Sequence, residues 1–282
     1  MVKKIFKIIA IVLVALLIIA LIAINVLFAR YDEMKTVEKI SAAGIQFEQA
    51  FVNYNGHKVN AWCFGDKDNE KALMIHGSPG HWVDWVELYT DTNLLRDFCL
   101  IAYDRPGYGG TTVPANGSLK VQAGVAAAVM EHFCGTDTCY SVAGHSYGGG
   151  VVEEVLIDHS EHVNAGIYVA GTLSPKDQPR KWYNYVAGFR PVQWVLPKAF
   201  VSSNIEMMIL ADELQKNKGL QETITTPIIL IQGTADMLVP YKTVDYYRSI
   251  KPTGVNYVIV EGMNHFIPWT DPEIVIEAIR GK

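Results

Sequence analysis

The chain of 282 residues carries 24 Lys and Arg against 29 Asp and Glu, a formal net charge of −5, and half of its residues are hydrophobic. This length can bury a substantial core in one large α/β domain or two small ones, and the composition excludes a disordered or collagen-like chain. All four charges in residues 1–30 are basic, so the remainder is acidic. Without a basic stripe, nucleic-acid binding is not expected.

The first expected element is an apolar helix. No residue from Ile8 to Ala29 is charged, and a helix of that length can cross a hydrocarbon core of about 30 Å. Lysines precede it and Asp32 and Glu33 follow it, which favours a cytoplasmic N-terminus. We expect residues 1–29 to form a cytoplasmic stub and single-pass transmembrane anchor, with an extracytoplasmic body. A cleaved signal peptide and a buried core helix are the alternatives.

Residues 30–48 are expected to form a mixed-charge linker or a short helix. Next, Asn55-Gly56 is a strong hairpin-turn signal between two apolar segments, Phe51–Tyr54 and His57–Phe64. Short apolar runs, spaced by helix-length segments, then recur along the chain, which is typical of parallel strands covered on both faces. These runs are Ala72–Ile75, Leu100–Tyr103, Tyr140–Ala143, Ile167–Ala170, Ile228–Ile231 and Tyr257–Val260.

Each run ends in a loop that contains glycine, and in open α/β sheets the ligand crevice lies outside these carboxyl ends. One connection is much longer than the others. About 55 residues, rich in aromatic side chains, separate Gly171 from Thr226. We expect a helical insertion over the crevice, at about residues 172–225.

The segment Gly144-His145-Ser146-Tyr147-Gly148 matches the G-x-S-x-G pattern, and it lies between an expected strand and an expected helix. A serine at such a sharp turn needs small neighbours two residues away on either side, and the two glycines supply them. The turn exposes the hydroxyl above the sheet and directs a helix N-terminus at developing negative charge. Ser146 is therefore the candidate nucleophile.

A serine nucleophile needs a base, and the base needs an orienting acid; in this kind of site their chain order is Ser, acid, His. Asp236 follows the expected strand Ile228–Ile231, and His265 follows the expected strand Tyr257–Val260. Both side chains should emerge at the same edge of the sheet as Ser146. We expect these three residues to form a catalytic triad.

A tetrahedral oxyanion needs preorganised donors. The backbone N–H of Tyr147, directly after the nucleophile, is one candidate. The N–H of Ser78, in the loop His76-Gly77-Ser78-Pro79-Gly80, is the other. His76 is expected to brace this loop.

Candidates for a substrate pocket are aromatic side chains near that loop and in the insertion, although packing in the core is the alternative for the tryptophans. They are His76, Trp82, Trp85, Trp182 and Trp194. The eight histidines show no metal-ligand spacing, so no metal or cofactor is expected.

Together, these motifs resemble the α/β-hydrolase family and follow its order across residues 49–282. They are His76–Gly80, Asp104–Gly109, Gly144–Gly149, Gly233–Asp236 with Val239-Pro240, and Gly262–His265. The resemblance implies an α/β fold with a mostly parallel eight-stranded sheet, helices on both faces and a helical cap formed by the insertion. Ser146 departs from the epoxide hydrolases and dehalogenases of the family, which use an aspartate nucleophile.

The four cysteines are candidates for disulfides. Cys134 and Cys139 flank a four-residue loop. The strand order of the family sets an antiparallel second strand beside the fourth, and this implies that Cys63 lies near Cys99. We therefore expect two bonds, with four free thiols as the alternative.

The sequence thus predicts a membrane-anchored serine hydrolase that cleaves a carboxylic ester or related acyl bond through an acyl-enzyme intermediate. Its substrate is expected to be a small acyl compound, with an ester or a lipid-like acyl compound favoured. Amidase or aminopeptidase, carbon–carbon bond hydrolase, and cofactor-free perhydrolase or haloperoxidase activities stay open on the same triad. A ligand-binding protein that keeps the fold without turnover is the alternative from another class.

Overall fold

The computed structural model describes residues 2–28, 33–135 and 139–281, and the chain divides into two units between Ala42 and Ala43. The first unit holds α1 (Val2–Phe28) and α2 (Glu33–Ala42). Among the described residues, no helix has both the length and the hydropathy that a membrane span requires. The transmembrane anchor expected over residues 1–29 is therefore not supported, whereas α2 agrees with the short helix expected within residues 30–48.

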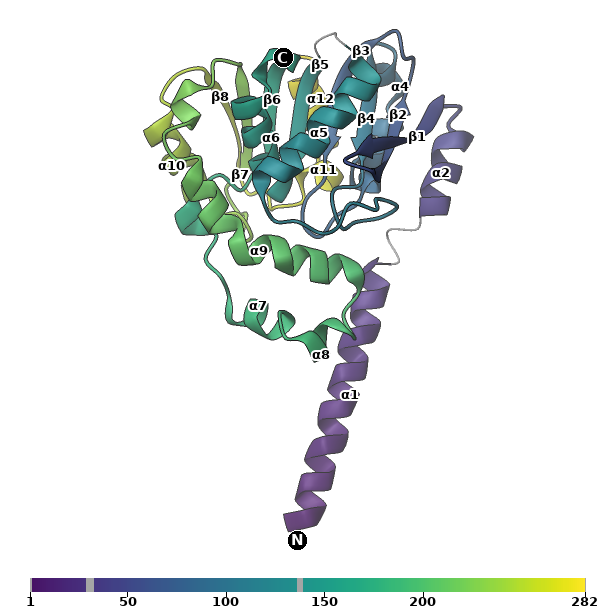
Figure 1. Ribbon diagram of the computed structural model, residues 1–282, viewed down its shortest axis with the longest axis vertical. Helices are drawn as coiled ribbons and strands as arrows, with labels where there is room; N and C mark the ends of the chain where they lie inside the picture. Colours follow the sequence, from purple (N-terminus) through teal and green to yellow (C-terminus); the bar gives the residue numbers. More distant parts are fainter. Residues whose placement is uncertain (1, 29–32, 136–138, 282) are drawn as a thin grey trace. The chain divides into compact units, whose positions relative to one another are not determined.

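The second unit is built on one eight-stranded sheet in the order β1-β2-β4-β3-β5-β6-β7-β8 (Figure 1). β2 runs antiparallel to both of its neighbours, and all pairs from β4 to β8 are parallel. The mostly parallel sheet expected from the sequence is thus confirmed. The strands are β1 (Phe47–Tyr54), β2 (His57–Phe64), β3 (Glu70–Ile75), β4 (Phe98–Tyr103), β5 (Cys139–His145), β6 (Val163–Val169), β7 (Ile228–Gly233) and β8 (Val255–Val260).

The predicted strands agree with this sheet except at their ends. The hairpin turn falls at Asn55 and Gly56, which have φ values of 51° and 81°, as turns between right-twisted strands require. β1 begins at Phe47, so the sheet takes up residues expected to belong to the linker before residue 49. Ala170 lies just after β6 and has a φ of 48°, which ends the extended conformation there.

Helices cover both faces of the sheet. α5 and α6 pack against each other in front of the sheet in Figure 1, while α11 and α12 lie behind it. The helices of this layer structure are α3 (Val86–Tyr89), α4 (Thr92–Leu95), α5 (Leu119–Cys134), α6 (Tyr147–Asp158), α10 (Lys242–Ile250), α11 (Ile267–Thr270) and α12 (Pro272–Ile279). Short 3₁₀ turns add η2 (Trp82–Trp85) and η3 (Ser160–His162).

The long connection between β6 and β7 is helical, as expected for residues 172–225. It contains η4 (Pro175–Asp177), α7 (Trp182–Ala187), α8 (Arg190–Gln193), α9 (Lys198–Lys216) and η5 (Gln221–Thr223). Asn184 of α7 donates to Asn204 of α9 over 3.0 Å, and both amides are buried. We call this insertion the cap.

A disulfide joins Cys63 of β2 to Cys99 of β4, with 6.3 Å between their Cα atoms. The bond follows from the antiparallel pairing of the two strands, in which Cys63 lies opposite Ile101, and it confirms one of the two expected bridges. Cys134 is also disulfide-bonded. The side chain of Cys139 lies outside the part of the chain that the structure describes, so the Cys134–Cys139 pairing stays a prediction.

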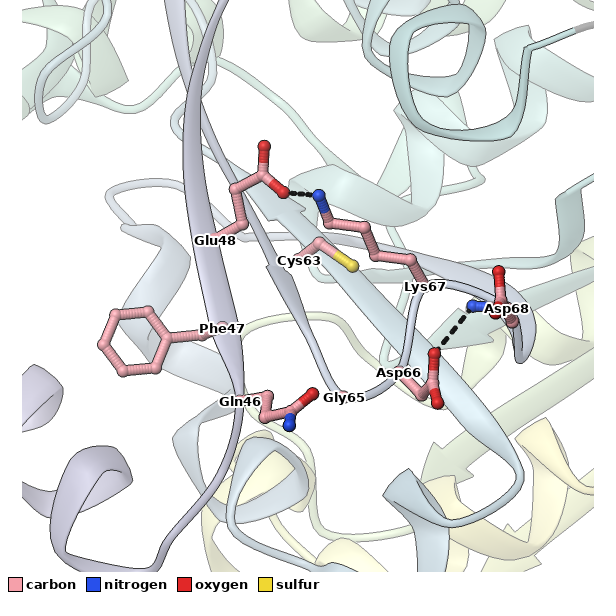
Figure 2. A pocket seen from close by; sticks show the side chains of 8 residues that line it. All are labelled: Gln46, Phe47, Glu48, Cys63, Gly65, Asp66, Lys67 and Asp68. Carbon is pink, nitrogen blue, oxygen red and sulfur yellow. Dashed lines mark hydrogen bonds and ion pairs between the residues drawn. The ribbon is translucent and has the colours of Figure 1, made fainter.

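A cavity of about 320 Å³ lies beside the first residues of β1 and the last residues of β2, next to Cys63 (Figure 2). Its lining is mostly polar, and an ion pair joins Lys67 to Glu48 there. The residues that line it are Gln46, Phe47, Glu48, Cys63, Gly65, Asp66, Lys67 and Asp68. None of the expected catalytic residues is among them.

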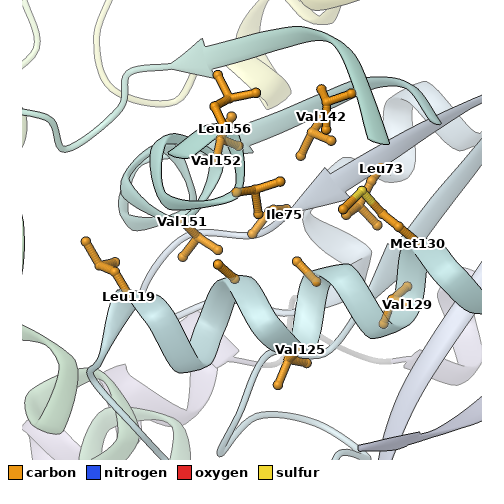
Figure 3. Close-up of a cluster of buried hydrophobic side chains, with 14 of the residues drawn as sticks. Leu73, Ile75, Leu119, Val125, Val129, Met130, Val142, Val151, Val152 and Leu156 are labelled. Atoms are coloured by element: carbon orange, nitrogen blue, oxygen red, sulfur yellow. The ribbon is translucent and has the colours of Figure 1, made fainter. Parts of the chain in front are cut away.

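The core lies between the sheet and the pair α5 and α6 (Figure 3). Leu73 and Ile75 of β3 and Val142 of β5 project toward Val151 of α6 and Val129 of α5, and all five side chains are fully buried. Burial of an aliphatic side chain of this size contributes about 1.5–3 kcal/mol to folding. This packing fixes α6, and hence the turn that precedes it, against the carboxyl end of β5.

Candidate active site

Ser146 occupies the turn between β5 and α6 with φ 55° and ψ −119°, a left-handed conformation that is costly for a residue with a side chain. Backbone bonds hold it there: Ser146 N–H donates to Val169 O over 2.9 Å, and Ser146 O accepts from the N–H of Thr172 over 3.0 Å. Gly144 and Gly148, on either side of Ser146, lie too close to neighbouring backbone atoms to carry a side chain. A Cβ on Gly144 would lie 2.2 Å from the carbonyl oxygen of Gly148.

His265 and Asp236 form a buried pair next to the sheet. Nδ1 of His265 lies 2.7 Å from Oδ2 of Asp236, while Oδ1 of Asp236 accepts the N–H groups of Leu238 and Val239, each over 2.8 Å. Burial opposes ionisation of Asp236, but the hydrogen bonds from His265 and from these two N–H groups outweigh it and lower the pKa of the carboxyl. Asp236 is therefore an ionised acceptor that fixes the imidazole of His265 through Nδ1.

His145, directly before Ser146, connects this pair to the serine turn. Its Nε2 lies 2.9 Å from the carbonyl oxygen of His265, and the two imidazole centroids are 4.7 Å apart. Because the bond to Asp236 uses Nδ1 of His265, Nε2 is the ring nitrogen left for a hydroxyl proton. Burial, followed by the neighbouring His265, lowers the pKa of His145 to about 3, so His145 stays neutral. Its place in the G-x-S-x-G motif was the one sequence signal for this residue.

The loop after β3 passes directly beside the serine turn. A Cβ on Gly77 would lie 3.2 Å from Cβ of Ser146, so a larger residue would force the loop or the turn to shift slightly. Nδ1–H of His76 donates to Gly77 O over 2.8 Å, and its Nε2 accepts from Arg105 N–H over 3.0 Å. His76 is fully buried, and burial, followed by the charge of Arg105, lowers its pKa. It braces the loop, as the sequence predicts.

The two expected oxyanion donors border the same turn. Tyr147 is the first residue of α6, and the first N–H groups of a helix have no partner within the helix. Ser78 lies in the loop after β3, where its Oγ is hydrogen-bonded to Tyr108 Oη at 3.1 Å and to Ser203 Oγ at 2.9 Å. The Ser78 hydroxyl is thus engaged, which leaves the backbone N–H as its contribution to chemistry.

The four tryptophans proposed as pocket residues lie in two different environments, and Trp85 contacts His145, the residue before Ser146, edge-on with ring centroids 6.4 Å apart. Trp82 and Trp85 are fully buried, and Trp82 stacks on Trp62 with ring centroids 4.7 Å apart. They belong to the core, the alternative that the sequence left open. Trp182 and Trp194, in the cap, are 76% and 82% exposed, so their contribution to a substrate pocket stays a prediction. Composition alone could not separate these environments.

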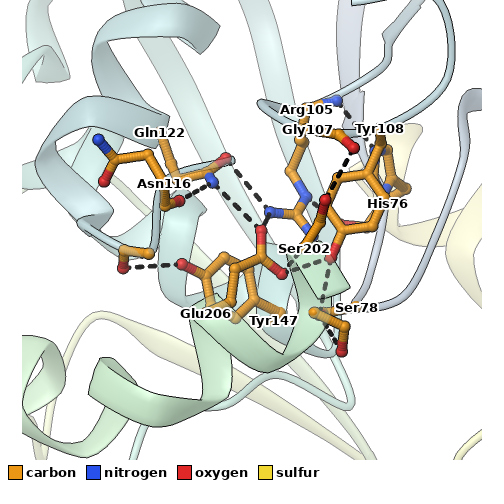
Figure 4. A network of polar contacts seen from close by, with 12 residues as sticks. His76, Ser78, Arg105, Gly107, Tyr108, Asn116, Gln122, Tyr147, Ser202 and Glu206 are labelled. Atoms are coloured by element: carbon orange, nitrogen blue, oxygen red, sulfur yellow. Dashed lines mark hydrogen bonds and ion pairs between the residues drawn. The ribbon is translucent and has the colours of Figure 1, made fainter. Parts of the chain in front are cut away.

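A buried polar network links the cap to the loop after β3, and no sequence pattern indicated it (Figure 4). Arg105, after β4, pairs with Glu206 of α9 at 2.5 Å, and both side chains are fully buried. Burial opposes the charge of Arg105, but Glu206 outweighs that effect and raises the pKa of the guanidinium. Tyr108 and Gln122 also donate to Glu206, over 2.7 and 3.2 Å.

Within the described residues, no cluster of three or more His, Cys, Asp or Glu side chains is arranged to hold a metal ion. The groups gathered at the carboxyl ends of β3, β5, β7 and β8 are instead a hydroxyl, an imidazole, an ionised carboxylate and backbone donors. Such a set suits acyl transfer through a serine nucleophile.

Known proteins share this architecture. The model of the Alpha/beta hydrolase family matches residues 72–278. A solved membrane phospholipase A, described as a bacterial virulence factor, superposes with a TM-score of 0.67 at 19% identity, covering 95% of this chain and 96% of its own. A thermophilic esterase from Thermogutta terrifontis gives 0.64 at 18% identity, covering 84% and 97%. At identities below 20%, these similarities show a shared fold and nothing about the activity.

A curated relative, a proline iminopeptidase from Thermoplasma volcanium, is 27% identical over 114 residues, which are 40% of this chain and 38% of that protein. The chain spans less than half the length of the curated relatives it matches.

Proposed function

Because the chain belongs to the alpha/beta hydrolase family, we propose that it is a serine hydrolase that cleaves a carboxylic ester or related acyl bond. The proposal is supported by the 2.7 Å bond between His265 Nδ1 and Asp236 Oδ2, together with a serine of positive φ at the start of α6.

In the first step, Ser146 Oγ attacks the substrate carbonyl as Nε2 of His265 takes the hydroxyl proton. Asp236 holds the imidazole and stabilises its positive charge. The N–H groups of Tyr147 and Ser78 donate to the tetrahedral oxyanion, a contribution that is typically worth about 10²–10³ in kcat per donor. When the intermediate collapses, the bond to the leaving group breaks and His265 gives it the proton.

The second half returns the enzyme to its starting state. Water attacks the acyl-enzyme and loses a proton to His265, the same N–H groups stabilise the second oxyanion, and the proton passes back to Ser146 as the acid product leaves.

An apolar, lipid-like acyl group is the favoured substrate. The side chains next to the triad are apolar and open to solvent: Met237 is 92% exposed, Leu238 61% and Phe266 46%. They follow Asp236 and His265 directly, so a bound acyl chain could cover them. The phospholipase and the esterase among the similar folds support the same substrate class. The proline iminopeptidase keeps an aminopeptidase activity as the second candidate.

We also propose that the hydrolase unit works outside the reducing cytoplasm, because it holds the Cys63–Cys99 disulfide and disulfides persist mainly in oxidising compartments. Alkylation of thiols in intact cells tests this location. Protection of Cys63 and Cys99 until reductant is added supports it, and modification of both without reductant contradicts it.

The test of function compares p-nitrophenyl esters of increasing acyl length with peptide p-nitroanilides, for the wild type and for Ser146→Ala. Turnover of longer esters that is lost in Ser146→Ala supports the acyl hydrolase. Turnover of the anilides alone replaces it with the aminopeptidase. A folded protein that turns over neither class contradicts the proposed ester hydrolysis.

A further inference from the structure

Arg105 holds the peptide unit that contains the expected oxyanion donor. Its Nε donates to His76 O over 2.9 Å, and its Nη2 donates to Gly77 O over 2.7 Å. The guanidinium is fully buried. The rigid fork of its donors therefore binds two successive carbonyl groups of the loop after β3.

Gly77 O and the N–H of Ser78 belong to one planar peptide unit. In this loop the cis bond is Ser78-Pro79, and the Gly77-Ser78 bond is trans. Across a trans peptide bond the carbonyl and the N–H point in opposite directions. An anchor on Gly77 O therefore fixes the direction of the Ser78 N–H on the other side of the same plane, and a donor on the oxygen also polarises that N–H.

Glu206 in turn fixes the guanidinium from the cap. Its Oε1 accepts from Arg105 Nη1 at 2.5 Å, and its Oε2 accepts from Nη2 at 3.3 Å. Nη2 is thus shared between the Glu206 carboxylate and Gly77 O. Because both charges are buried, loss of the carboxylate charge would leave the guanidinium without compensation and let it shift.

A second contact joins the same two segments. Ser78 Oγ is hydrogen-bonded to Ser203 Oγ at 2.9 Å, and Ser203 lies one helical turn before Glu206 on α9. Helix α9 thus contacts the loop twice, once through the Ser78 side chain and once through Arg105.

We propose that Glu206 and Arg105 are positioning residues for oxyanion stabilisation: through them, helix α9 of the cap sets the direction of the Ser78 N–H. The inference rests on the proposed hydrolase function. It implies that the cap contributes to kcat as well as to substrate binding.

The test uses Glu206→Gln in the full chain, with Glu213→Gln as the matched control. Glu213 lies on the same helix and is buried, but it accepts from the N–H of Leu119, away from the loop after β3. In Glu206→Gln an NH₂ group replaces one carboxylate oxygen and faces the donors of Arg105. We expect kcat to fall roughly ten- to hundredfold, with KM changed less than about twofold, as for a misdirected oxyanion donor.

A transition-state analogue separates positioning from general loosening. A trifluoromethyl ketone inhibitor becomes a hemiketal oxyanion on Ser146, so its affinity should fall in proportion to kcat/KM. The affinity for the matching methyl ketone, which binds without forming a stable oxyanion, should stay unchanged. Equal losses for both ketones, or an unchanged kcat in folded Glu206→Gln, would overturn the inference.

If Glu206→Gln does not fold, the same measurements of kcat and ketone affinity are made on Tyr108→Phe. It removes the hydroxyl that donates to Glu206 over 2.7 Å and that is also hydrogen-bonded to Ser78 Oγ at 3.1 Å, and it leaves the ion pair intact. A smaller fall in kcat with the same selective loss of trifluoromethyl ketone affinity supports the inference, and wild-type values for both contradict it. If the wild type itself shows no Ser146-dependent turnover, the proposed function fails; if it does and these variants match it, the positioning role alone fails.

Discussion

Nδ1 of His265 and Oδ2 of Asp236 lie 2.7 Å apart although the two residues are 29 positions apart in the chain. Adjacent parallel strands β7 and β8 bring them together, since each residue follows the carboxyl end of its strand. The neutral His145, directly before Ser146 in the chain, packs its imidazole against that of His265, with the ring centroids 4.7 Å apart.

Asp236→Asn should lower kcat by about 10³–10⁴, because the amide leaves the imidazole of His265 in the wrong tautomer and without a counter-charge. Steady-state ester hydrolysis measures the change. Asp245→Asn, which alters an exposed carboxylate of α10, is the matched control and should keep wild-type kcat. A near-normal kcat in folded Asp236→Asn would exclude Asp236 as the orienting acid.

Gly148→Ala should lower the free energy of unfolding by about 1–3 kcal/mol, the usual cost of overpacking. The new Cβ would lie 2.5 Å from the carbonyl oxygen of Ile75, a backbone atom of β3 that cannot move away cheaply. Urea unfolding measures the loss. Gly124→Ala is the control, because its Cβ would meet only the Tyr54 hydroxyl, the end of a side chain. Equal stability of the two variants would contradict this account of the turn.

The free energy of unfolding should fall as the pH rises from about 4.5 to about 8, because of Glu153. Burial, and then the charge of Glu154, raises the pKa of Glu153 from 4.5 to about 8. In the folded chain Glu153 therefore keeps a proton that it loses near pH 4.5 in the unfolded chain. The contribution of Glu153 to the free energy of unfolding is complete below pH 4.5 and disappears as the pH approaches 8. Its size is about 3–5 kcal/mol.

Urea unfolding of Glu153→Gln across this pH range tests that statement. The variant should show a flatter pH dependence than the wild type, whereas Glu131→Gln, which alters an exposed residue of α5, should follow the wild-type curve. If Glu153→Gln and the wild type have parallel curves, Glu153 is not the group responsible.

The positions of Ser146, Asp236 and His265 at one edge of the sheet could be predicted from the sequence, because each of them directly follows a predicted parallel strand. The apolar runs of β5, β7 and β8 are readable from composition, and parallel strands bring the residues after them to one edge. The Arg105–Glu206 pair could not be found this way. The two residues are 101 positions apart, and a carboxylate within a helical insertion is ordinarily solvated. Trp82 and Trp182 likewise differ in burial through tertiary packing alone.

Removal of the Cys63–Cys99 bond by Cys63→Ser with Cys99→Ser should lower the free energy of unfolding by about 3–4 kcal/mol. The bridge closes a loop with a sequence separation of 36, and opening it raises the entropy of the unfolded chain. Urea unfolding under non-reducing conditions gives the value. Addition of reductant to the wild type should lower the free energy of unfolding at least as much, because it also opens the bond of Cys134, and a double variant as stable as the oxidised wild type would contradict the expectation.

The proposed role of Ser146 as the nucleophile is tested most directly by intact-mass analysis after reaction with a fluorophosphonate probe, followed by peptide mapping. The account predicts one adduct per chain on Ser146, no adduct in Ser146→Ala, and much slower labelling in His265→Ala. A folded wild-type chain that stays unlabelled, or an adduct that maps to another residue and persists in Ser146→Ala, would contradict it.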